Sequence, residues 1–202
     1  HTLEPKYYEC LLRMRRPDGL ILPAGAFVPV VEQLGLMRQI DRCTLDLAVE
    51  ELHRDLNVRL TLNISGMTAS DQAWLRKLVG LLRGQPEIAT RLMIEITETV
   101  VLQDLDESAR FVAAVRDLGC GVALDDFGAG YTSFRNLQAL AVDMVKIDGA
   151  FIKDLANRPD NQLFIRTLLG LAKGFGLDTV AECVETEAEA AILRKEEVTF
   201  MQ

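Results

Sequence analysis

Short apolar runs alternate with longer segments whose apolar residues recur at helical spacing, and this alternation continues along nearly the whole chain. The apolar runs predict strands, and the amphipathic segments predict helices. Strands are predicted at Tyr7–Met14, Arg59–Ile64, Leu92–Thr97, Gly121–Leu124, Asp143–Ile147, Asp178–Ala181 and Val198–Met201. Helices are predicted at Pro23–Gly35, Leu36–Asp55, Asp71–Leu82, Asp106–Leu118, Phe134–Leu140, Asn161–Phe175 and Glu187–Leu193. Several strands are apolar throughout, which indicates a parallel sheet buried on both faces.

Two α/β architectures fit this alternation. A doubly wound open sheet would gather its ligand residues at one switch point. Here polar residues follow nearly every strand, which favours a closed βα barrel, in which all strand carboxyl ends meet at one face. About seven predicted strands are one fewer than the eight of a TIM barrel. We therefore expect a single domain over residues 1–202, truncated at both ends and lacking part of the first and last barrel units.

Composition narrows the function classes. The chain has 202 residues and a net charge of -8, which argues against binding a nucleic-acid polymer but not against a small phosphate ligand. It shows no signal peptide and no apolar run long enough to span a membrane, so we expect no membrane contact by this domain. The four cysteines form no Cys-x-x-Cys pair and are expected to be thiols of a reducing, cytoplasmic compartment.

Acidic or amide residues occur at the ends of the strand-like runs. So many carboxylates at one barrel face would repel one another unless cations lay between them. Oxygen donors suit Mg²⁺ or Mn²⁺, whereas zinc would require more histidine or a cysteine cluster. The residues are Glu9, Asn63, Glu95, Glu98, Asp125, Asp126, Glu182 and Glu185.

The segment that begins at Asp125, Asp-Asp-Phe-Gly-Ala-Gly-Tyr, allows several interpretations. It could be a strand-to-helix turn that needs glycine at Gly128 and Gly130. A nucleotide-binding Gly-x-Gly loop is weakly supported, since Ser133 stands where the third glycine would be. A kinase Asp-Phe-Gly triplet lacks its companion motifs.

Two ionisable residues lie within predicted buried strands, where charge is costly without a partner. Glu95 must bind metal or form an internal ion pair. Lys146 could be a salt-bridge partner, or could hold a water molecule and accept its proton. Arg13, at a predicted strand end, could be a surface cation or could bind a phosphate through two hydrogen bonds.

Six motifs in order resemble those of the EAL domain family of bacterial cyclic-di-GMP phosphodiesterases. They are Glu-Cys-Leu-Leu-Arg, Leu-Asn-Ile-Ser, Glu-Ile-Thr-Glu, Asp-Asp-Phe-Gly-Ala-Gly-Tyr, Lys-Ile-Asp and Ala-Glu-Cys-Val-Glu. The resemblance implies a modified TIM barrel that hydrolyses cyclic di-GMP to linear pGpG with two Mg²⁺ or Mn²⁺ ions. It also implies a homodimer, with the loop Asp126–Ser133 near the interface, and fusion to sensor, receiver or GGDEF modules.

The resemblance assigns roles to individual residues. It implies metal ligands at Glu9, Asn63, Glu95, Asp125 and Asp126, and substrate contacts at Leu11, Arg13 and Asp148. It implies that Lys146 positions or deprotonates the attacking water, and that Glu182, Glu185 and Gln202 lie near the metals and their waters. Glu98 would steady the loop Asp126–Ser133.

The sequence departs from the family pattern without losing a metal ligand. Cys10 replaces the signature alanine, and Cys183 replaces the usual glycine and could crowd the backbone near Glu182. A catalytically silent cyclic-di-GMP receptor is the first alternative function, and an unrelated Mg²⁺-dependent barrel enzyme acting on another phosphate ester is the second.

Overall fold

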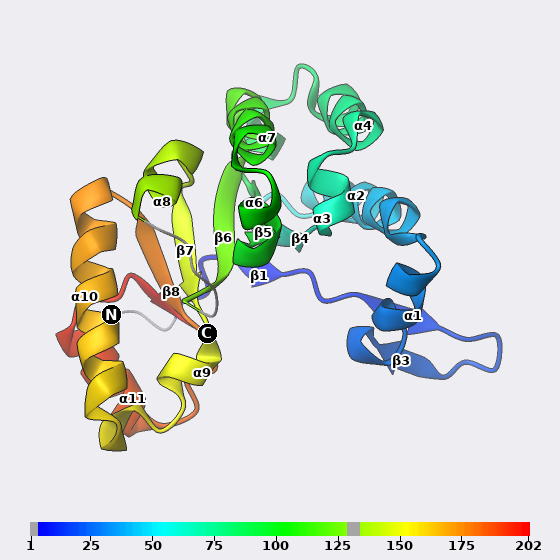
Figure 1. Cartoon of the computed structure of the whole chain (residues 1–202). Helices are drawn as coiled ribbons and strands as arrows, with labels where there is room; N and C mark the ends of the chain where they lie inside the picture. Colours follow the sequence, from blue (N-terminus) through cyan, green and yellow to red (C-terminus); the bar gives the residue numbers. More distant parts are fainter. Residues whose placement is uncertain (1–3, 129–133) are drawn as a thin grey trace. The chain divides into compact units, whose positions relative to one another are not determined.

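A computed structural model of the chain describes residues 4–128 and 134–202, and these residues divide into two compact units. One unit comprises His1–Glu95 and Ala114–Gly121, and the other comprises Ile96–Ala113 and Val122–Gln202. Each unit contains parallel strands and helices that connect them, as the alternating pattern predicts (Figure 1).

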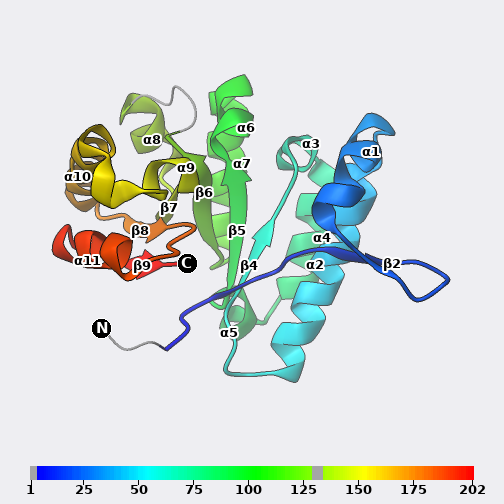
Figure 2. The ribbon, with the colours of Figure 1, turned by 90° about the horizontal axis from the view of Figure 1, so that it is seen from below.

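The first unit begins with very short strands and contains one long helix. In chain order its elements are β1 (Tyr8–Glu9), β2 (Arg13–Arg15), β3 (Ile21–Pro23), the 3₁₀ turn η1 (Ala24–Ala26), α1 (Val28–Gln33), α2 (Met37–Arg54), β4 (Leu60–Asn63), α3 (Gly66–Ala69), α4 (Gln72–Leu82), α5 (Pro86–Ala89) and β5 (Leu92–Thr97). Strand β4 pairs in parallel with both β1 and β5. Helices α2 and α4 lie side by side (Figure 2).

The prediction of one strand over Tyr7–Met14 is wrong. The chain leaves the sheet after Glu9, and β2 pairs with β3 in a separate antiparallel hairpin. A turn closes this hairpin, with Gly19 at a φ of 88° and Leu20 N–H donating to the Asp18 carboxylate. Pro-Asp-Gly is a turn signal that the prediction overlooked.

Arg91 joins three segments of the first unit. Its guanidinium donates hydrogen bonds to the carbonyl oxygens of Leu52 at 2.7 Å, Asp55 at 2.8 Å and Val58 at 3.1 Å. Its Nε also donates to the carbonyl of Glu87 at 3.1 Å. One side chain therefore provides hydrogen-bond donors for backbone carbonyl groups at the end of α2, in the segment before β4, and in α5.

Replacing Arg91 with methionine is expected to lower the free energy of unfolding by about 3 kcal/mol, because several hydrogen bonds from a charged donor are lost together. Chemical denaturation measures this. Arg76→Met, at an exposed position of α4, is the control and should change stability by less than about 0.5 kcal/mol. Equal stabilities of the two variants would contradict the joining role of Arg91.

The second unit contains four of the strands. In chain order its elements are α6 (Glu98–Gln103), α7 (Leu105–Asp117), β6 (Gly121–Phe127), α8 (Phe134–Leu140), β7 (Met144–Ile147), α9 (Gly149–Ile152), the 3₁₀ turn η2 (Leu155–Asn157), α10 (Pro159–Phe175), β8 (Asp178–Ala181), α11 (Glu187–Lys195) and β9 (Phe200–Met201). The unit boundary falls within β5, within α7 and at the start of β6. Strands β6 to β9 pair in parallel in chain order.

Most predicted elements of the second unit are confirmed, with changed ends. The predicted strand Gly121–Leu124 continues to Phe127, so Asp125 and Asp126 lie within the strand. The short helices α6 and α9 were not predicted, because four to six residues are too few for helical periodicity to show. Among the described residues, no helix is long and apolar enough to cross a membrane.

Candidate active site

A bulge in β6 brings two consecutive acidic residues to the same place. Side chains of neighbouring strand residues normally point to opposite faces of a sheet. Leu124 pairs with Val145 and Phe127 pairs with Ile147, so β6 has one more residue than β7 between the two pairs. Asp126 adopts a left-handed φ of 53°, which Asp tolerates better than most residues. The irregularity lets Asp125 and Asp126 serve one site.

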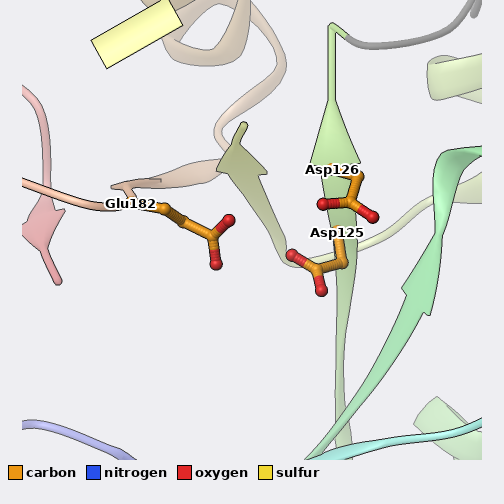
Figure 3. Close-up of side chains that lie close together, drawn as sticks. All are labelled: Asp125, Asp126 and Glu182. Atoms are coloured by element: carbon orange, nitrogen blue, oxygen red, sulfur yellow. The ribbon is translucent and has the colours of Figure 1, made fainter. Parts of the chain in front are cut away.

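Glu182 completes this acidic cluster. It follows β8 directly, and its backbone N–H donates to the carbonyl of Ile147 on β7. Carboxylate oxygens of Asp125, Asp126 and Glu182 all lie within 4.8 Å of one another, and the three side chains face one another (Figure 3). Three converging carboxylates form a donor set that fits a hard divalent cation such as Mg²⁺ or Mn²⁺.

Lys146 lies buried beneath the cluster. Its side chain is 3% exposed, and its ammonium lies 2.7 Å from the Glu182 carboxylate and 3.2 Å from Oδ1 of Asp125. That oxygen is itself buried and accepts no hydrogen bond of good geometry from the residues that the structure describes. Two carboxylates stabilise the charged form of this lysine, which offsets the cost of its burial. Two roles were predicted for Lys146, that of a salt-bridge partner and that of a residue that holds a water molecule and accepts its proton. The ion pairs are present, and they place the ammonium among the acidic residues.

The surroundings of Asp126 disfavour the ionised form of its carboxyl group. Burial and then the negative charges of Asp125 and Asp148 raise the pKa of the Asp126 carboxyl, although the residue retains exposed surface and Lys146 opposes the shift. A raised pKa means that the ionised carboxylate is less favourable in the folded protein than in the unfolded chain. Asp126 therefore destabilises the metal-free protein above the pKa of an unfolded aspartate, about 3.9, and this penalty disappears at lower pH.

Replacing Asp126 with asparagine is accordingly expected to raise the thermal unfolding midpoint at pH 7 in buffer containing a chelator. Saturating Mn²⁺ should stabilise the wild type more than the variant. A ligand at a hundred times its dissociation constant contributes about 2.7 kcal/mol of stability. Differential scanning calorimetry with and without Mn²⁺ measures both effects.

The control for this prediction is Asp178→Asn, at the exposed opposite end of β8. It should leave the midpoint and its response to Mn²⁺ unchanged. A midpoint for Asp126→Asn below that of the wild type in chelator would show that Asp126 does not repel its neighbours.

A second acidic group lies in the first unit, at the carboxyl ends of β1, β4 and β5. Asn63 pairs in register with Glu95, and its amide nitrogen donates to the Glu9 carboxylate at 2.8 Å. Glu95 is 1% exposed. Burial and then the charges of Glu95 and Glu9 raise the pKa of the Cys10 thiol. The first unit thus gathers Glu9, Asn63 and Glu95, and the second gathers Asp125, Asp126, Glu182 and Lys146.

The remaining predicted site residues hold less specific positions. The buried carboxylate of Glu98 accepts a hydrogen bond from Gly128 N–H at 3.1 Å, at the start of the predicted loop. Residues 129–133 of that loop lie outside the described residues. Asp148 caps α9 by accepting from Ala150 N–H. The other four residues, Leu11, Arg13, Glu185 and Gln202, are exposed.

Cys183 has an unusual backbone conformation and lies close to Gly149. It adopts a φ of 55°, a conformation that costs a residue with a Cβ roughly 1–2 kcal/mol and that glycine adopts readily. The thiol packs against Gly149, since a Cβ added there would lie 2.7 Å from the Cys183 sulfur. Crowding of the backbone beside Glu182 by Cys183 stays a prediction, and the contact of Cys183 with Gly149 had no signal in the sequence.

Comparisons with known proteins identify the family of this chain. The EAL domain family model matches residues 2–202. The cyclic di-GMP phosphodiesterase PA2567 of Pseudomonas aeruginosa is 35% identical over 183 residues, which are 88% of this chain and 31% of that protein. The chain thus spans about a third of the length of the curated relatives that it matches.

Solved structures agree as well. The PaMucR phosphodiesterase in complex with c-di-GMP superimposes with a TM-score of 0.86 at 29% identity, covering 94% of this chain and 79% of that one. The FimX EAL domain from Pseudomonas aeruginosa bound to c-di-GMP gives a TM-score of 0.90 at 26% identity, covering 97% of this chain and 80% of that one. The expected TIM-barrel-like α/β fold is confirmed, and this chain belongs to the EAL domain family.

Proposed function

We propose that this chain is a metal-dependent phosphodiesterase that hydrolyses cyclic di-GMP to linear pGpG. The observation that carries the proposal is the convergence of the carboxylates of Asp125, Asp126 and Glu182, two of which pair with the buried ammonium of Lys146. Family membership and the phosphodiesterases among the relatives support it.

The proposed metal ligands are Glu9, Asn63, Glu95, Asp125 and Asp126, and Glu182 and Glu185 are proposed to lie near the metals and their waters. All offer oxygen atoms, which suits Mg²⁺ or Mn²⁺. When bound, two such cations polarise phosphoryl oxygens and lower the pKa of water.

The side chains of this protein perform the remaining tasks. Lys146, held by Asp125 and Glu182, is proposed to orient the attacking water through its ammonium, or to accept the proton of that water as the neutral amine. The water oxygen bonds to phosphorus and the bond from phosphorus to the 3′ oxygen breaks. The 3′ oxygen takes up the proton that the water loses and leaves as a hydroxyl. Arg13, Leu11 and Asp148 are proposed to bind the dinucleotide, with the guanidinium of Arg13 on a phosphate. Gln202 is proposed to lie near the attacking water.

The test is hydrolysis of cyclic di-GMP by the purified chain with Mg²⁺ or Mn²⁺, followed as pGpG, beside a binding titration in Ca²⁺. Glu9→Ala should abolish turnover, because it removes a proposed metal ligand. It should leave the unfolding midpoint within a few degrees of the wild type, because Glu9 is not one of the buried core residues. Full activity of Glu9→Ala would overturn the ligand assignment.

A catalytically silent receptor is the second candidate, and one observation favours it: a non-glycine residue in left-handed conformation directly after Glu182. Tight binding of cyclic di-GMP by the wild type with no pGpG formed under any metal condition would support the receptor over the enzyme.

The location, the oligomeric state and the neighbouring modules of this domain are also proposals. We propose a cytoplasmic homodimer within a larger protein that carries sensor, receiver or GGDEF modules. Analytical ultracentrifugation over a hundredfold concentration range tests the dimer, and a monomer at every concentration would exclude it.

A further inference from the structure

Glu189, in the first turn of α11, is a buried acid outside the proposed site. It is 5% exposed, and its carboxylate accepts hydrogen bonds from three backbone N–H groups. These belong to Thr186 at 2.9 Å, Glu185 at 3.2 Å and Asp154 at 2.9 Å. Hydrogen bonds of Thr186, and then of the backbone at Asp154, lower the pKa of this carboxyl, so it is ionised at neutral pH.

Part of this arrangement is ordinary helix capping. The Thr186 hydroxyl accepts from Glu189 N–H at 3.2 Å, while one carboxylate oxygen of Glu189 accepts from Thr186 N–H. This reciprocal pair is a capping box, which satisfies the free N–H groups at the start of α11. A capping box does not account for the second carboxylate oxygen, which accepts from Asp154, 35 residues earlier.

The second oxygen therefore connects two segments that both leave the carboxyl ends of strands. The segment 182–186 follows β8 and carries Glu182 and Glu185. Asp154 begins η2, has a left-handed φ of 59°, and follows Lys146 of β7 through α9. Helix α11 and η2 pack against each other, and the chain after α9 passes close to α11 (Figure 1).

The two segments meet again nearer the site. Gly149, the first residue of α9, lies against the Cys183 thiol, and Glu182 N–H donates to the carbonyl of Ile147. At the start of segment 182–186, Glu182 and Cys183 contact the chain at the end of β7 and the start of α9. At the end of the segment, Glu189 connects the backbone N–H groups of Glu185 and Thr186 to that of Asp154.

We propose that Glu189 is a positioning residue, which fixes the segment carrying Glu182 relative to the chain after β7 and so holds the Glu182 carboxylate at Lys146 and the metal. This inference rests on the proposed phosphodiesterase function. Residues behind metal ligands typically change metal affinity or activity by about 10–100-fold when they are replaced.

The test compares two substitutions at Glu189 with one at its capping partner. Glu189→Gln keeps the size of the side chain but leaves one acceptor oxygen for three N–H groups. Glu189→Asp keeps negative charge at the start of α11 but is too short to reach Thr186 and Asp154 together. Thr186→Ala removes the hydroxyl half of the capping box and leaves the Glu189 carboxylate in place.

Two quantities are measured for each protein: Mn²⁺ affinity, from the electron paramagnetic resonance signal of free Mn²⁺, and kcat and KM for pGpG formation. We expect Glu189→Gln and Glu189→Asp to weaken Mn²⁺ binding and to lower kcat by about tenfold or more. Thr186→Ala should change both by less than about twofold, although it also lowers the unfolding midpoint.

The outcomes separate the two proposals. If the wild type forms pGpG and Glu189→Asp behaves like Thr186→Ala in metal affinity and kcat, Glu189 is only a helix cap and the positioning role is overturned. If Glu189→Gln does not fold, Glu189→Asp decides the question alone. A wild type that neither binds Mn²⁺ nor forms pGpG overturns the proposed function, and the positioning role with it.

Discussion

Replacing Lys146 with methionine is expected to lower the kcat for cyclic-di-GMP hydrolysis by about 10²–10⁴-fold, the range typical of a lost proton-transfer or water-orienting group. Methionine fills a similar space but carries no charge. The carboxylates of Asp125 and Glu182, now 3.2 Å and 2.7 Å from the ammonium, would face each other without it. Added Mg²⁺ should restore stability to this variant but not activity.

A matched control exists in the same unit. Lys173 on α10 pairs with Glu197 at 2.8 Å, but its side chain is 77% exposed, so its ion pair is screened by water. Lys173→Met should therefore keep the wild-type kcat. Steady-state kinetics of both variants, at Mg²⁺ concentrations that saturate each, make the comparison. Similar kcat values for the two variants would remove Lys146 from the mechanism.

The second large effect concerns the contact between Gly149 and Cys183. Gly149→Ala is expected to lower the free energy of unfolding by about 1–3 kcal/mol, the usual cost of overpacking. The new Cβ would lie 2.7 Å from the sulfur and 2.8 Å from the Cβ of Cys183. Chemical denaturation measures the loss. Gly170→Ala, in α10 with no atom within 4 Å of the added Cβ, should instead stabilise by about 0.5–1 kcal/mol.

A double-mutant cycle isolates this contact. Cys183→Gly removes the atoms that the new Cβ would strike, and it also removes the strain of a left-handed cysteine at a φ of 55°. In the Cys183→Gly background, Gly149→Ala should cost less than about 0.5 kcal/mol, so the two substitutions couple by about 0.5 kcal/mol or more. Additive effects would show that the two residues do not constrain each other.

The strand and helix order was readable from the sequence, because the strands of a buried parallel sheet are rich in apolar residues. The strands at Leu92–Thr97 and Asp178–Ala181 have the predicted ends. The hairpin of β2 and β3 was missed, because its strands are short and mostly exposed, so hydrophobicity gives no signal there. Family membership was also readable, because it depends on residue types in order.

The candidate site was only partly readable. The sequence predicted a site made of strand-end carboxylates, since charge at the end of an apolar strand is costly without a partner, and three of them, Asp125, Asp126 and Glu182, lie together in the structure. The resemblance assigned both Asp125 and Asp126 to the metals, but the sequence did not indicate how two neighbouring strand residues reach one site, which depends on a bulge and one left-handed residue. Lys146 was left between an ion pair and a catalytic role, because partners on other strands are invisible in one chain segment.

By itself, the sequence determined the α/β class and the family, and it predicted the acidic residues of the site, because hydrophobic periodicity and residue type are local properties. The tertiary structure alone decided three things: the ion pairs of Lys146, the contact between Cys183 and Gly149, and the hydrogen bonds that Glu189 accepts from three backbone N–H groups. Each depends on distances between segments far apart in the chain, and such distances arise only when the strands pair and the helices pack against them.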